Sequence, residues 1–271
     1  MNTLIDGVKI AKIDALDRGL QYGDGVFETI AVRNGQLLLW DRHMSRLIQG
    51  CMQLNIPAPD QALLLEEASG LCNGIEQGII KIVVTRGAGG RGYRAPDSPH
   101  PTRIITRYPW PDYPMPHESQ GVSVRLCTTR LGRNPCLAGI KHLNRLEQVL
   151  ARSEWSDPGI SEGLMLDEQG NVIEGTMSNI FLVSQNRLLT PDLSACGIQG
   201  VVRGLILDLA RELGIEYEIT EISLKRLHSA DEIFLTNSVI GLWPVRELDD
   251  KSYNTGPITS CIVKKLANYL R

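Results

Sequence analysis

The chain has 271 residues, of which 42% are hydrophobic and 22% are charged, and its formal net charge is −3. This length allows two domains, each with its own core, and the absence of a long basic run argues against a nucleic-acid partner. No apolar stretch approaches the roughly 18 residues of a membrane span, and the first residues lack the basic and apolar regions of a signal peptide.

Cysteine usage points to a reducing compartment. The six cysteines are scattered, without a Cys-x-x-Cys pair: Cys51, Cys72, Cys127, Cys136, Cys196 and Cys261. This pattern argues against a disulfide framework and against a zinc or other metal site. It predicts reduced thiols and a cytoplasmic protein.

The N-terminal part is predicted to mix strands and helices. Asp6-Gly7 and Asn34-Gly35 are two-residue turn signals flanked by apolar residues. The expected elements, in order, are a hairpin at 2–14, a Gly-rich polar loop at 17–25, a strand at 26–32, a returning strand at 37–40, a helix capped by Asp41, a helix at 59–73, and strands at 79–85 and 103–108.

A dense group of prolines, Pro109, Pro111, Pro114 and Pro116, follows these elements. Such a stretch is incompatible with a helix or a central strand and is typical of a linker. We therefore expect a small N-terminal domain at 1–110, an interdomain linker at 111–120 and a larger C-terminal domain at 121–271.

The C-terminal part again mixes strands and helices. The expected elements are a strand at 122–127, a helix beginning after Lys141, strands at 163–166, 172–183 and 187–190, a helix entered through residues 197–203 and ending at Gly214, a strand at 216–222, a short helix at 224–229, a strand at 232–235 and a helix at 258–271.

Lys141 stands between the small turn around Gly139 and an expected amphipathic helix, whose apolar residues are Leu143, Leu146, Val149 and Leu150. A lysine at such a junction can point into a cleft and act as the nucleophilic amine that carries pyridoxal phosphate as a Schiff base. The alternative for a single lysine in this setting is a solvated surface residue.

Glu174 lies in a strand pattern with apolar neighbours, Val172 and Ile173. It either faces solvent on an edge strand or is buried with a partner. If it is buried beside the pyridine nitrogen of pyridoxal phosphate, a charge-assisted hydrogen bond would keep that nitrogen protonated and strengthen the ring as an electron sink.

Several residues are candidates for holding a phosphate. The glycines at 197 and 200 precede a helix, where backbone amides and the helix dipole attract anions, although a plain helix-entry loop has the same pattern. Arg46, one helical turn after His43, could add a fork of donors or be a solvated helix residue. Asn237 and Ser238 could donate further hydrogen bonds or form a turn.

The loop at 86–94 is Gly-rich and basic. Arg91 and Arg94 could bind substrate carboxylates side-on, or the loop could be a mobile hairpin tip. It lacks the P-loop pattern, which argues against nucleotide binding. For His142, beside the lysine, we expect a structural role, because a lysine amine can itself move protons.

Several motifs together resemble the fold-type IV pyridoxal phosphate enzymes, the class of branched-chain aminotransferases, D-amino acid aminotransferases and aminodeoxychorismate lyases. The resemblance extends over nearly the whole chain. It rests on Lys141 and on residues 22–28 (YGDGVFE), 43–47 (HMSRL), 174–181 (EGTMSNIF) and 200–203 (GVVR). Residues 86–93 (RGAGGRGY), 130–135 (RLGRNP) and 137–147 (LAGIKHLNRLE) resemble the aminodeoxychorismate lyases in particular.

The resemblance implies an α/β (α+β) fold with a small N-terminal domain, a larger C-terminal domain with a barrel-like sheet, and a homodimer with the site between the two domains. It implies a lyase of folate biosynthesis that splits 4-amino-4-deoxychorismate into 4-aminobenzoate and pyruvate. The alternative is a D-amino acid or branched-chain aminotransferase of the same fold. Phe27 weakens that alternative, because branched-chain aminotransferases usually have Tyr there.

The same resemblance assigns roles to individual residues. Lys141 would be the Schiff-base lysine and Glu174 the partner of the ring nitrogen. Arg46 and the backbone of Val201 and Val202 would hold the phosphate. Ser238, where aminotransferases often have Thr, or Asn237 would assist them, and Ile198 would pack on the ring.

Overall fold

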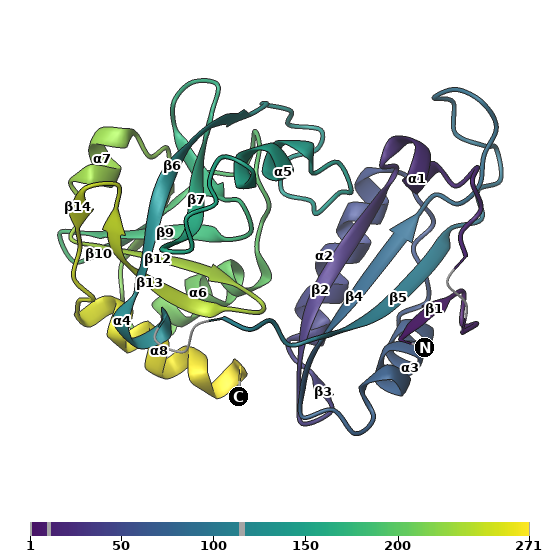
Figure 1. Cartoon of the computed structure of the whole chain (residues 1–271), viewed down its shortest axis with the longest axis horizontal. Helices are drawn as coiled ribbons and strands as arrows, with labels where there is room; N and C mark the ends of the chain where they lie inside the picture. The colour runs from purple at the N-terminus through teal and green to yellow at the C-terminus, as the bar shows by residue number, and fades with distance from the viewer. Residues whose placement is uncertain (1, 10–11, 114–116, 271) are drawn as a thin grey trace. The chain divides into compact units, whose positions relative to one another are not determined.

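The structure is a computed structural model that describes residues 2–9, 12–113 and 117–270. It divides into two compact units. The first runs to Pro111 and also takes in Ile140–Asn144, whereas the second consists of Asp112–Gly139 and the chain from Arg145 onward. Figure 1 traces this course from purple through teal to yellow.

The first unit is built on a five-stranded antiparallel sheet in the order β1-β5-β4-β2-β3. The strands are β1 (Thr3–Ile5), β2 (Gly25–Arg33), β3 (Gln36–Leu37), β4 (Gln77–Thr85) and β5 (Thr102–Pro109). Both predicted turns are confirmed, because Asp6, Gly7, Asn34 and Gly35 all have positive φ angles. Residues 10 and 11 of the expected hairpin at 2–14 lie outside the described residues. Its described part contains a bridge from Ile5 to Val8, and β1 pairs with β5.

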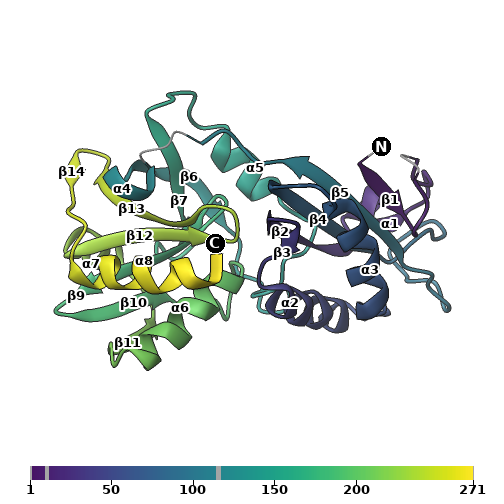
Figure 2. The same cartoon turned by 90° about the horizontal axis from the view of Figure 1, so that it is seen from below.

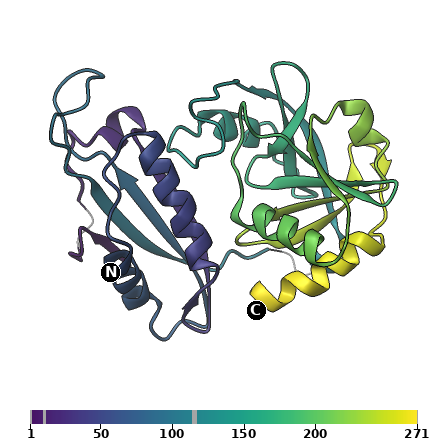
Figure 3. The same cartoon turned by 180° about the vertical axis from the view of Figure 1, so that it is seen from behind.

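Helices α2 (Trp40–Gln53) and α3 (Gln61–Cys72) cover the apolar face of this sheet. Figure 3 shows α2 packed against the sheet, running roughly along the strands. Helix α3 confirms the helix expected at 59–73, and the side chain of Asp60 caps it. Asp41 does not cap α2: the helix begins one residue earlier, after Leu39 in a left-handed conformation, and the returning strand ends at Leu37.

The predicted Gly-rich loop at 17–25 contains a short helix, α1 (Arg18–Tyr22). The Asp17 side chain accepts a hydrogen bond from the Gly19 amide, and Gly23 ends the helix in a left-handed conformation. Both caps were present in the sequence. The expectation of an irregular loop was wrong because five residues are too few to show an apolar period.

The second unit contains a nine-stranded mixed sheet in the order β11-β10-β9-β12-β13-β6-β7-β8, with β14 paired to β13. Its two ends curl toward each other, because β8 also contacts β9 and β10. The strands are β6 (Val122–Leu131), β7 (Ile160–Asp167), β8 (Val172–Gly175), β9 (Asn179–Ser184), β10 (Arg187–Pro191), β11 (Tyr217–Thr220), β12 (Glu232–Asn237), β13 (Gly241–Leu248) and β14 (Lys251–Ser252).

Helices α6 and α8 contact each other and pack on β12, as Figure 2 shows. The helices of this unit are α4 (His117–Gln120), α5 (Leu146–Arg152), α6 (Val201–Glu212), α7 (Leu224–His228) and α8 (Pro257–Leu270). The buried face of α6 carries Leu205, Ile206 and Leu209, and the helix is followed by Gly214 with a positive φ angle, as predicted.

Three expectations for the second unit need correction. The expected strand at 172–183 is split into β8 and β9 by a turn at 176–178. Strands β13 and β14 were not predicted at all. Within the expected linker at 111–120, residues 114–116 lie outside the described residues, and 117–120 form α4, so the exclusion of a helix there was wrong at its end.

Candidate active site

Lys141 belongs to a short extended segment that is fastened to β2. The Phe27 amide donates to the Lys141 carbonyl at 2.9 Å, and the Leu143 amide donates to the Gly25 carbonyl at the same distance. These bonds flank an antiparallel bridge from Val26 to His142. The lysine therefore does not stand at a helix start: α5 begins five residues later, at Leu146.

The expected apolar stripe of α5 is not a core stripe. Leu146, Val149 and Leu150 are 75%, 58% and 61% exposed, whereas Gln148 and Ala151 are buried. The prediction of a helix was correct, but α5 packs on the rest of the second unit with the opposite face, which carries Gln148 and Ala151. An apolar surface is therefore left uncovered on this chain.

The half-buried Lys141 ammonium lies over an aromatic ring. Its Nζ is 4.5 Å from the centroid of the Phe27 ring, and the Nζ of Lys81 is 5.0 Å from the same centroid. A cation above an aromatic face is attracted by the ring quadrupole. The ring of Phe27 thus positions the lysine side chain from the strand to which the lysine backbone is bonded.

The other side of β2 carries a buried ion-pair cluster. Arg46 Nε donates to Glu28 Oε1 at 2.8 Å and Arg46 Nη2 to Oε2 at 2.5 Å, while His43 Nδ1 lies 2.6 Å from Oε2. Burial by itself raises the pKa of Glu28, but the charge of Arg46 and the hydrogen bonds from Arg46 and His43 outweigh it and lower the pKa to about 2.

His43 is neutral in this cluster. Burial lowers the pKa of its ring, and the charges of Arg46 and Lys141 lower it further, against the opposing effect of Glu28. Since Nδ1 faces a carboxylate oxygen, it carries the proton. Its Nε2 is buried and has no hydrogen-bond partner among the described residues.

Glu174 is buried at the end of β8, so the solvent-facing alternative is excluded. Its Oε2 accepts a hydrogen bond from the Ile198 amide at 2.8 Å. Arg145, whose pKa is lowered by burial, interacts electrostatically with Glu174. A buried carboxylate with this setting has the chemistry needed to hold a protonated pyridine nitrogen.

The α6 N-terminus has the features of an anion site. Gly200 is its N-cap residue and gives no side-chain hydrogen bond to the helix, and Val201 and Val202 are the first helical residues. A Cβ at Gly200 would lie 1.9 Å from Asn179 Oδ1, so a side chain here would force the Asn179 amide to move. Asn179 Nδ2 also donates to the Ile198 carbonyl at 2.8 Å, which fixes the loop ahead of the helix. These residues fit a phosphate group.

A buried glutamate fixes the turn that follows Glu174. Glu162 Oε1 accepts from the amides of Gly163 and Thr176 and from Thr176 Oγ1, at 2.9, 3.1 and 2.5 Å. Its Oε2 accepts from the Met177 amide at 3.1 Å and from Ser178 Oγ at 2.9 Å. The carboxylate therefore ties β7 to the turn at 176–178.

Asn237 at the end of β12 forms a turn. Its Oδ1 accepts from the amides of Val239 and Ile240, and its Nδ2 donates to the Met177 carbonyl at 3.0 Å. This was one of the two alternatives for Asn237. Its neighbour Ser238 is half-buried.

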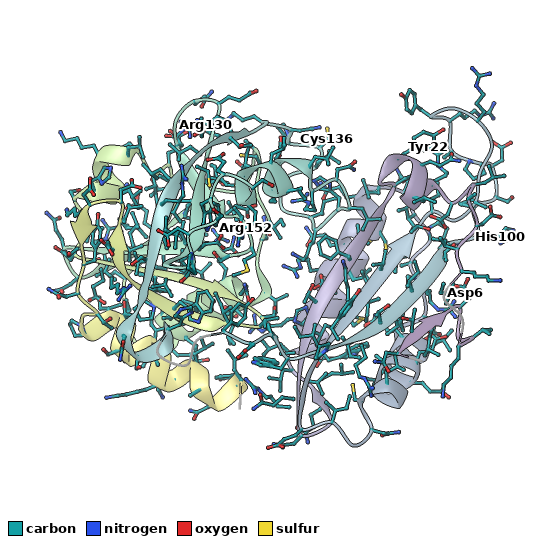
Figure 4. All side chains as sticks on the ribbon, viewed as in Figure 1. Asp6, Tyr22, His100, Arg130, Cys136 and Arg152 are labelled. Atoms are coloured by element: carbon teal, nitrogen blue, oxygen red, sulfur yellow. The ribbon has the colours of Figure 1, made fainter. Side chains whose placement is uncertain are left out.

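The loop at 86–94 is held by the buried Arg18. Arg18 donates to the carbonyls of Gly92, Tyr93 and Arg94 and to Asp24 Oδ2. Tyr93 contacts Tyr22 edge to face at 5.5 Å, and Figure 4 labels Tyr22 at the end of α1. The two candidate arginines of this loop, Arg91 and Arg94, are exposed, and Arg94 pairs with Asp97 at 3.0 Å.

The structure brings the candidates together in two sets. The first unit holds Lys141 and Arg46, and the second holds Glu174, Ile198, Val201 and Val202. Sequence reasoning assigned no role to Glu28 or Glu162. For Glu28 a signal existed, namely an acid inside an apolar strand followed by His43 and Arg46 on one helix face.

Two features are absent from the part of the chain that the structure describes. No group of three or more His, Cys, Asp or Glu side chains among the described residues could hold a metal ion. No helix that these residues form is both long and apolar enough to cross a membrane.

Known proteins match the chain over most of its length. Residues 25–248 match the family model for amino-transferase class IV. The chain is 36% identical over 241 residues to the aminodeoxychorismate lyase of Vibrio harveyi, with 89% of each sequence covered. It is 33% identical to a putative branched-chain-amino-acid aminotransferase of Methanocaldococcus jannaschii, covering 95% of this chain and 90% of that protein.

Among solved structures, the crystal structure of 4-amino-4-deoxychorismate lyase from Pseudomonas aeruginosa is similar, with a TM-score of 0.95 and 47% identity, and the likeness covers 99% of each chain.

Proposed function

The chain belongs to the amino-transferase class IV family, and we propose that it is a pyridoxal 5′-phosphate-dependent lyase that converts 4-amino-4-deoxychorismate to 4-aminobenzoate and pyruvate in folate biosynthesis. The predicted fold-type IV class is confirmed by the family match and by the likeness to a lyase structure. The observation that carries the proposal is the placement of Lys141 over Phe27 in a chain whose relatives of 36% and 47% identity are aminodeoxychorismate lyases.

Four groups of this chain would hold the cofactor. Lys141 would bind it covalently, Glu174 would hold the ring nitrogen, and Ile198 would pack on the ring. The amides of Val201 and Val202 would receive the phosphate. Glu174 and Ile198 are already joined by a hydrogen bond, so the nitrogen partner and the ring contact are positioned together.

Arg46 and Ser238 would complete the phosphate site. Arg46 carries the planar fork of donors that suits a phosphate. Ser238 is the preferred donor from the turn after β12, because the Asn237 side chain is bonded to Val239, Ile240 and Met177.

The covalent chain supports a shared cofactor. The Gly139 amide donates to the Gly197 carbonyl at 2.9 Å, and the Gln199 amide donates to the Gly139 carbonyl at 3.0 Å. Gly139 precedes Lys141 by two residues, which span at most about 7 Å. The loop that carries Ile198 is therefore bonded to the segment that immediately precedes Lys141 in the sequence.

Bound pyridoxal phosphate supplies an electron-withdrawing ring. Lys141 would hold the cofactor in the resting enzyme, and once the substrate amine has taken its place, the freed Lys141 amine would accept the proton from C4 of the substrate. The bond between C3 and the ether oxygen would then break, which completes the aromatic ring of 4-aminobenzoate. The fragment would leave as enolpyruvate, and a proton equivalent to the one taken from C4 would convert it to pyruvate. No keto acid takes part. Arg91 and Arg94 are proposed to bind the two substrate carboxylates.

An aminotransferase is the second candidate, because an aminotransferase also matches at 33% identity. The two activities differ in their second substrate. A transaminase needs a keto acid, whereas the lyase forms 4-aminobenzoate and pyruvate from a single compound. The deciding experiment supplies purified protein with 4-amino-4-deoxychorismate, without any keto acid, and measures 4-aminobenzoate. Absence of product here, with transamination when a keto acid is added, would contradict the lyase proposal.

Lys141→Ala should abolish detectable turnover, because the variant lacks both the covalent anchor of the cofactor and the base. The visible absorption band of the bound cofactor should disappear with it, and borohydride should no longer fix the cofactor to the chain. Lys81→Ala is the control, since Lys81 lies over the same Phe27 ring but is not assigned the covalent role. Near-wild-type turnover in Lys141→Ala would refute the assignment.

A homodimer is part of the proposal. The exposed apolar stripe of α5, Leu146, Val149 and Leu150, is the surface we assign to contact with a second copy. Val149→Glu should shift the mass measured by light scattering from two chains toward one. An unchanged two-chain mass would place the contact elsewhere, and a one-chain mass for the wild-type protein would refute the dimer.

The predicted domain limits, 1–110 and 121–271 with a linker at 111–120, belong to the proposal as well. The two compact units support them, with residues 140–144 added to the first. A cytoplasmic location is likewise proposed, and it is supported by the six cysteines, which all lie in the described part of the chain and form no disulfide there.

A further inference from the structure

Glu28 is a fully buried carboxylate, and both of its oxygens accept hydrogen bonds from side chains of α2. Arg46 approaches it side-on, with Nε on Oε1 and Nη2 on Oε2, and His43 Nδ1 shares Oε2. Arg46 itself is only 11% exposed. Its side-chain direction is therefore set by the protein, and chiefly by this carboxylate.

The side-on pair fixes more than the position of the charge. A guanidinium is planar, so two parallel hydrogen bonds fix both its plane and its rotation. With Nε and Nη2 on the carboxylate, Nη1 lies on the edge of the group that points away from Glu28. A lysine ammonium, which lacks a second rigidly placed N–H, could not be oriented in this way.

The cluster is also linked to the lysine through one strand. Phe27 and Glu28 are neighbours on β2, and their side chains point to opposite faces of the sheet. Phe27 bonds to the Lys141 carbonyl and lies under its ammonium, while Glu28 binds Arg46 and His43 of α2. Two consecutive residues of β2 thus hold the proposed covalent anchor and the proposed phosphate ligand.

We propose that Glu28 is a positioning residue for cofactor recognition: its side-on pair with Arg46 orients the guanidinium for the phosphate of pyridoxal phosphate. The inference rests on the proposed role of Arg46. The carboxylate has a second effect of opposite sign, because its negative charge lies near a site for a phosphate anion and weakens the net attraction. Removing the charge of Glu28 should therefore weaken the binding of pyridoxal phosphate if Glu28 orients Arg46, and strengthen it if Glu28 acts only through its charge.

The test measures dissociation constants of the full-length apoenzyme for two ligands, pyridoxal phosphate and pyridoxal, from the absorbance of the Lys141 adduct. Glu28→Gln removes the charge and the second acceptor oxygen at nearly constant shape. If Glu28 orients Arg46, this variant should bind pyridoxal phosphate at least tenfold more weakly and pyridoxal about as well as the wild type. If Glu28 acts only through its charge, it should bind pyridoxal phosphate more tightly.

Glu67→Gln is the matched control. Glu67 pairs side-on with Arg103 in the same unit, at 2.8 and 3.2 Å, and its side chain is 9% exposed. This variant loses a comparable ion pair that has no proposed role toward the cofactor. It should bind both ligands as the wild type does, which separates a specific effect on phosphate from a general loss of stability.

Arg46→Lys keeps the positive charge and covers the case in which Glu28→Gln does not fold. It should show the same selective loss for pyridoxal phosphate, and wild-type binding by this variant would overturn the inference. Arg46→Met tests the underlying assignment. Unchanged affinity for pyridoxal phosphate in Arg46→Met would refute the phosphate role of Arg46 itself. A loss there, combined with unchanged or tighter binding in Glu28→Gln, would refute only the role of Glu28.

Discussion

Glu28 in the first unit and Glu162 in the second are both fully buried, yet their charges are compensated in different ways. Glu28 is bound by a guanidinium and an imidazole. Glu162 receives five hydrogen bonds from amides and hydroxyls. A cation partner neutralises a buried charge through one long side chain, whereas neutral donors do so only when several backbone groups converge.

The difference has a structural consequence. The Glu28 cluster joins β2 to α2 through side chains alone, so Glu28 and Arg46 can be replaced together by apolar residues. The Glu162 cluster is built largely from the backbone of a turn, so the turn and the carboxylate require each other. Each cluster lies next to a residue of the proposed site. Glu28 follows Phe27, which contacts Lys141, and the turn at 176–178 begins two residues after Glu174.

The largest expected effect on stability comes from removing one member of the ion pair. Glu28→Leu leaves Arg46 buried without its carboxylate and should lower the free energy of unfolding in urea by roughly 3–5 kcal/mol. Changing Arg46→Met in the same chain removes the stranded charge and should recover at least half of that loss. If the double variant is as unstable as the sum of the two single variants, the compensation is not pairwise.

Glu162→Gln should cost less, about 1–3 kcal/mol, because at most the Met177 amide and the Ser178 hydroxyl on Oε2 lose their acceptor, while the amide oxygen of glutamine keeps the three donors on Oε1. A second side-chain change should not rescue it, since the amides of Gly163, Thr176 and Met177 remain. Adding Thr176→Val provides the check by the same urea unfolding. If stability recovers as much as expected for the Glu28 and Arg46 pair, then the Glu162 cluster also depends on a single side-chain partner, and the two clusters do not differ in this respect.

The smallest effect is on pH dependence. The folded-state pKa of Glu28, about 2, lies below its ordinary value of 4.5, so its stabilisation is complete above pH 4.5 and is lost as the pH falls toward 2. The loss should reach roughly 1 kcal/mol by pH 3.5. His43, whose pKa is lowered, adds a loss that begins as the pH falls below 6.5. In urea unfolding, the Glu28→Gln variant should lack the loss of stability that Glu28 causes below pH 4.5. A variant whose stability falls with acid just as that of the wild type does would contradict this.

Secondary structure was predictable from the sequence where the local apolar and polar pattern matches the burial of the residues in the folded chain. Strands β2 and β4 alternate between a helix-covered and an open face, and α3 carries its own cap at Asp60. Strand β13 was missed because Pro244 lies in its middle and interrupts the strand pattern. The start of α5 was misplaced because residues 141–143 are held by β2, a partner more than a hundred residues earlier in the chain.

The candidate site was predictable to a similar extent. Residue chemistry and the family resemblance selected Lys141, Arg46 and Glu174, and the structure gives each a definite environment. The sequence carried a signal that Glu28, His43 and Arg46 could form a cluster, but the side-on pairing of Arg46 with Glu28 depends on how α2 packs on β2, 18 residues apart in the sequence. The cage of Glu162 likewise depends on the pairing of β7 with β8.

The borrowed segment Ile140–Asn144 affects how the protein can be made. The first unit needs it, because the Gly25 carbonyl and the Phe27 amide on β2 bond to Leu143 and Lys141. During synthesis, the N-terminal unit therefore cannot complete its fold until residue 144 has left the ribosome. By then β6, the first strand of the second unit, has also emerged. A fragment that stops at Pro111 would end before the piece that completes its sheet edge and that carries the reactive amine.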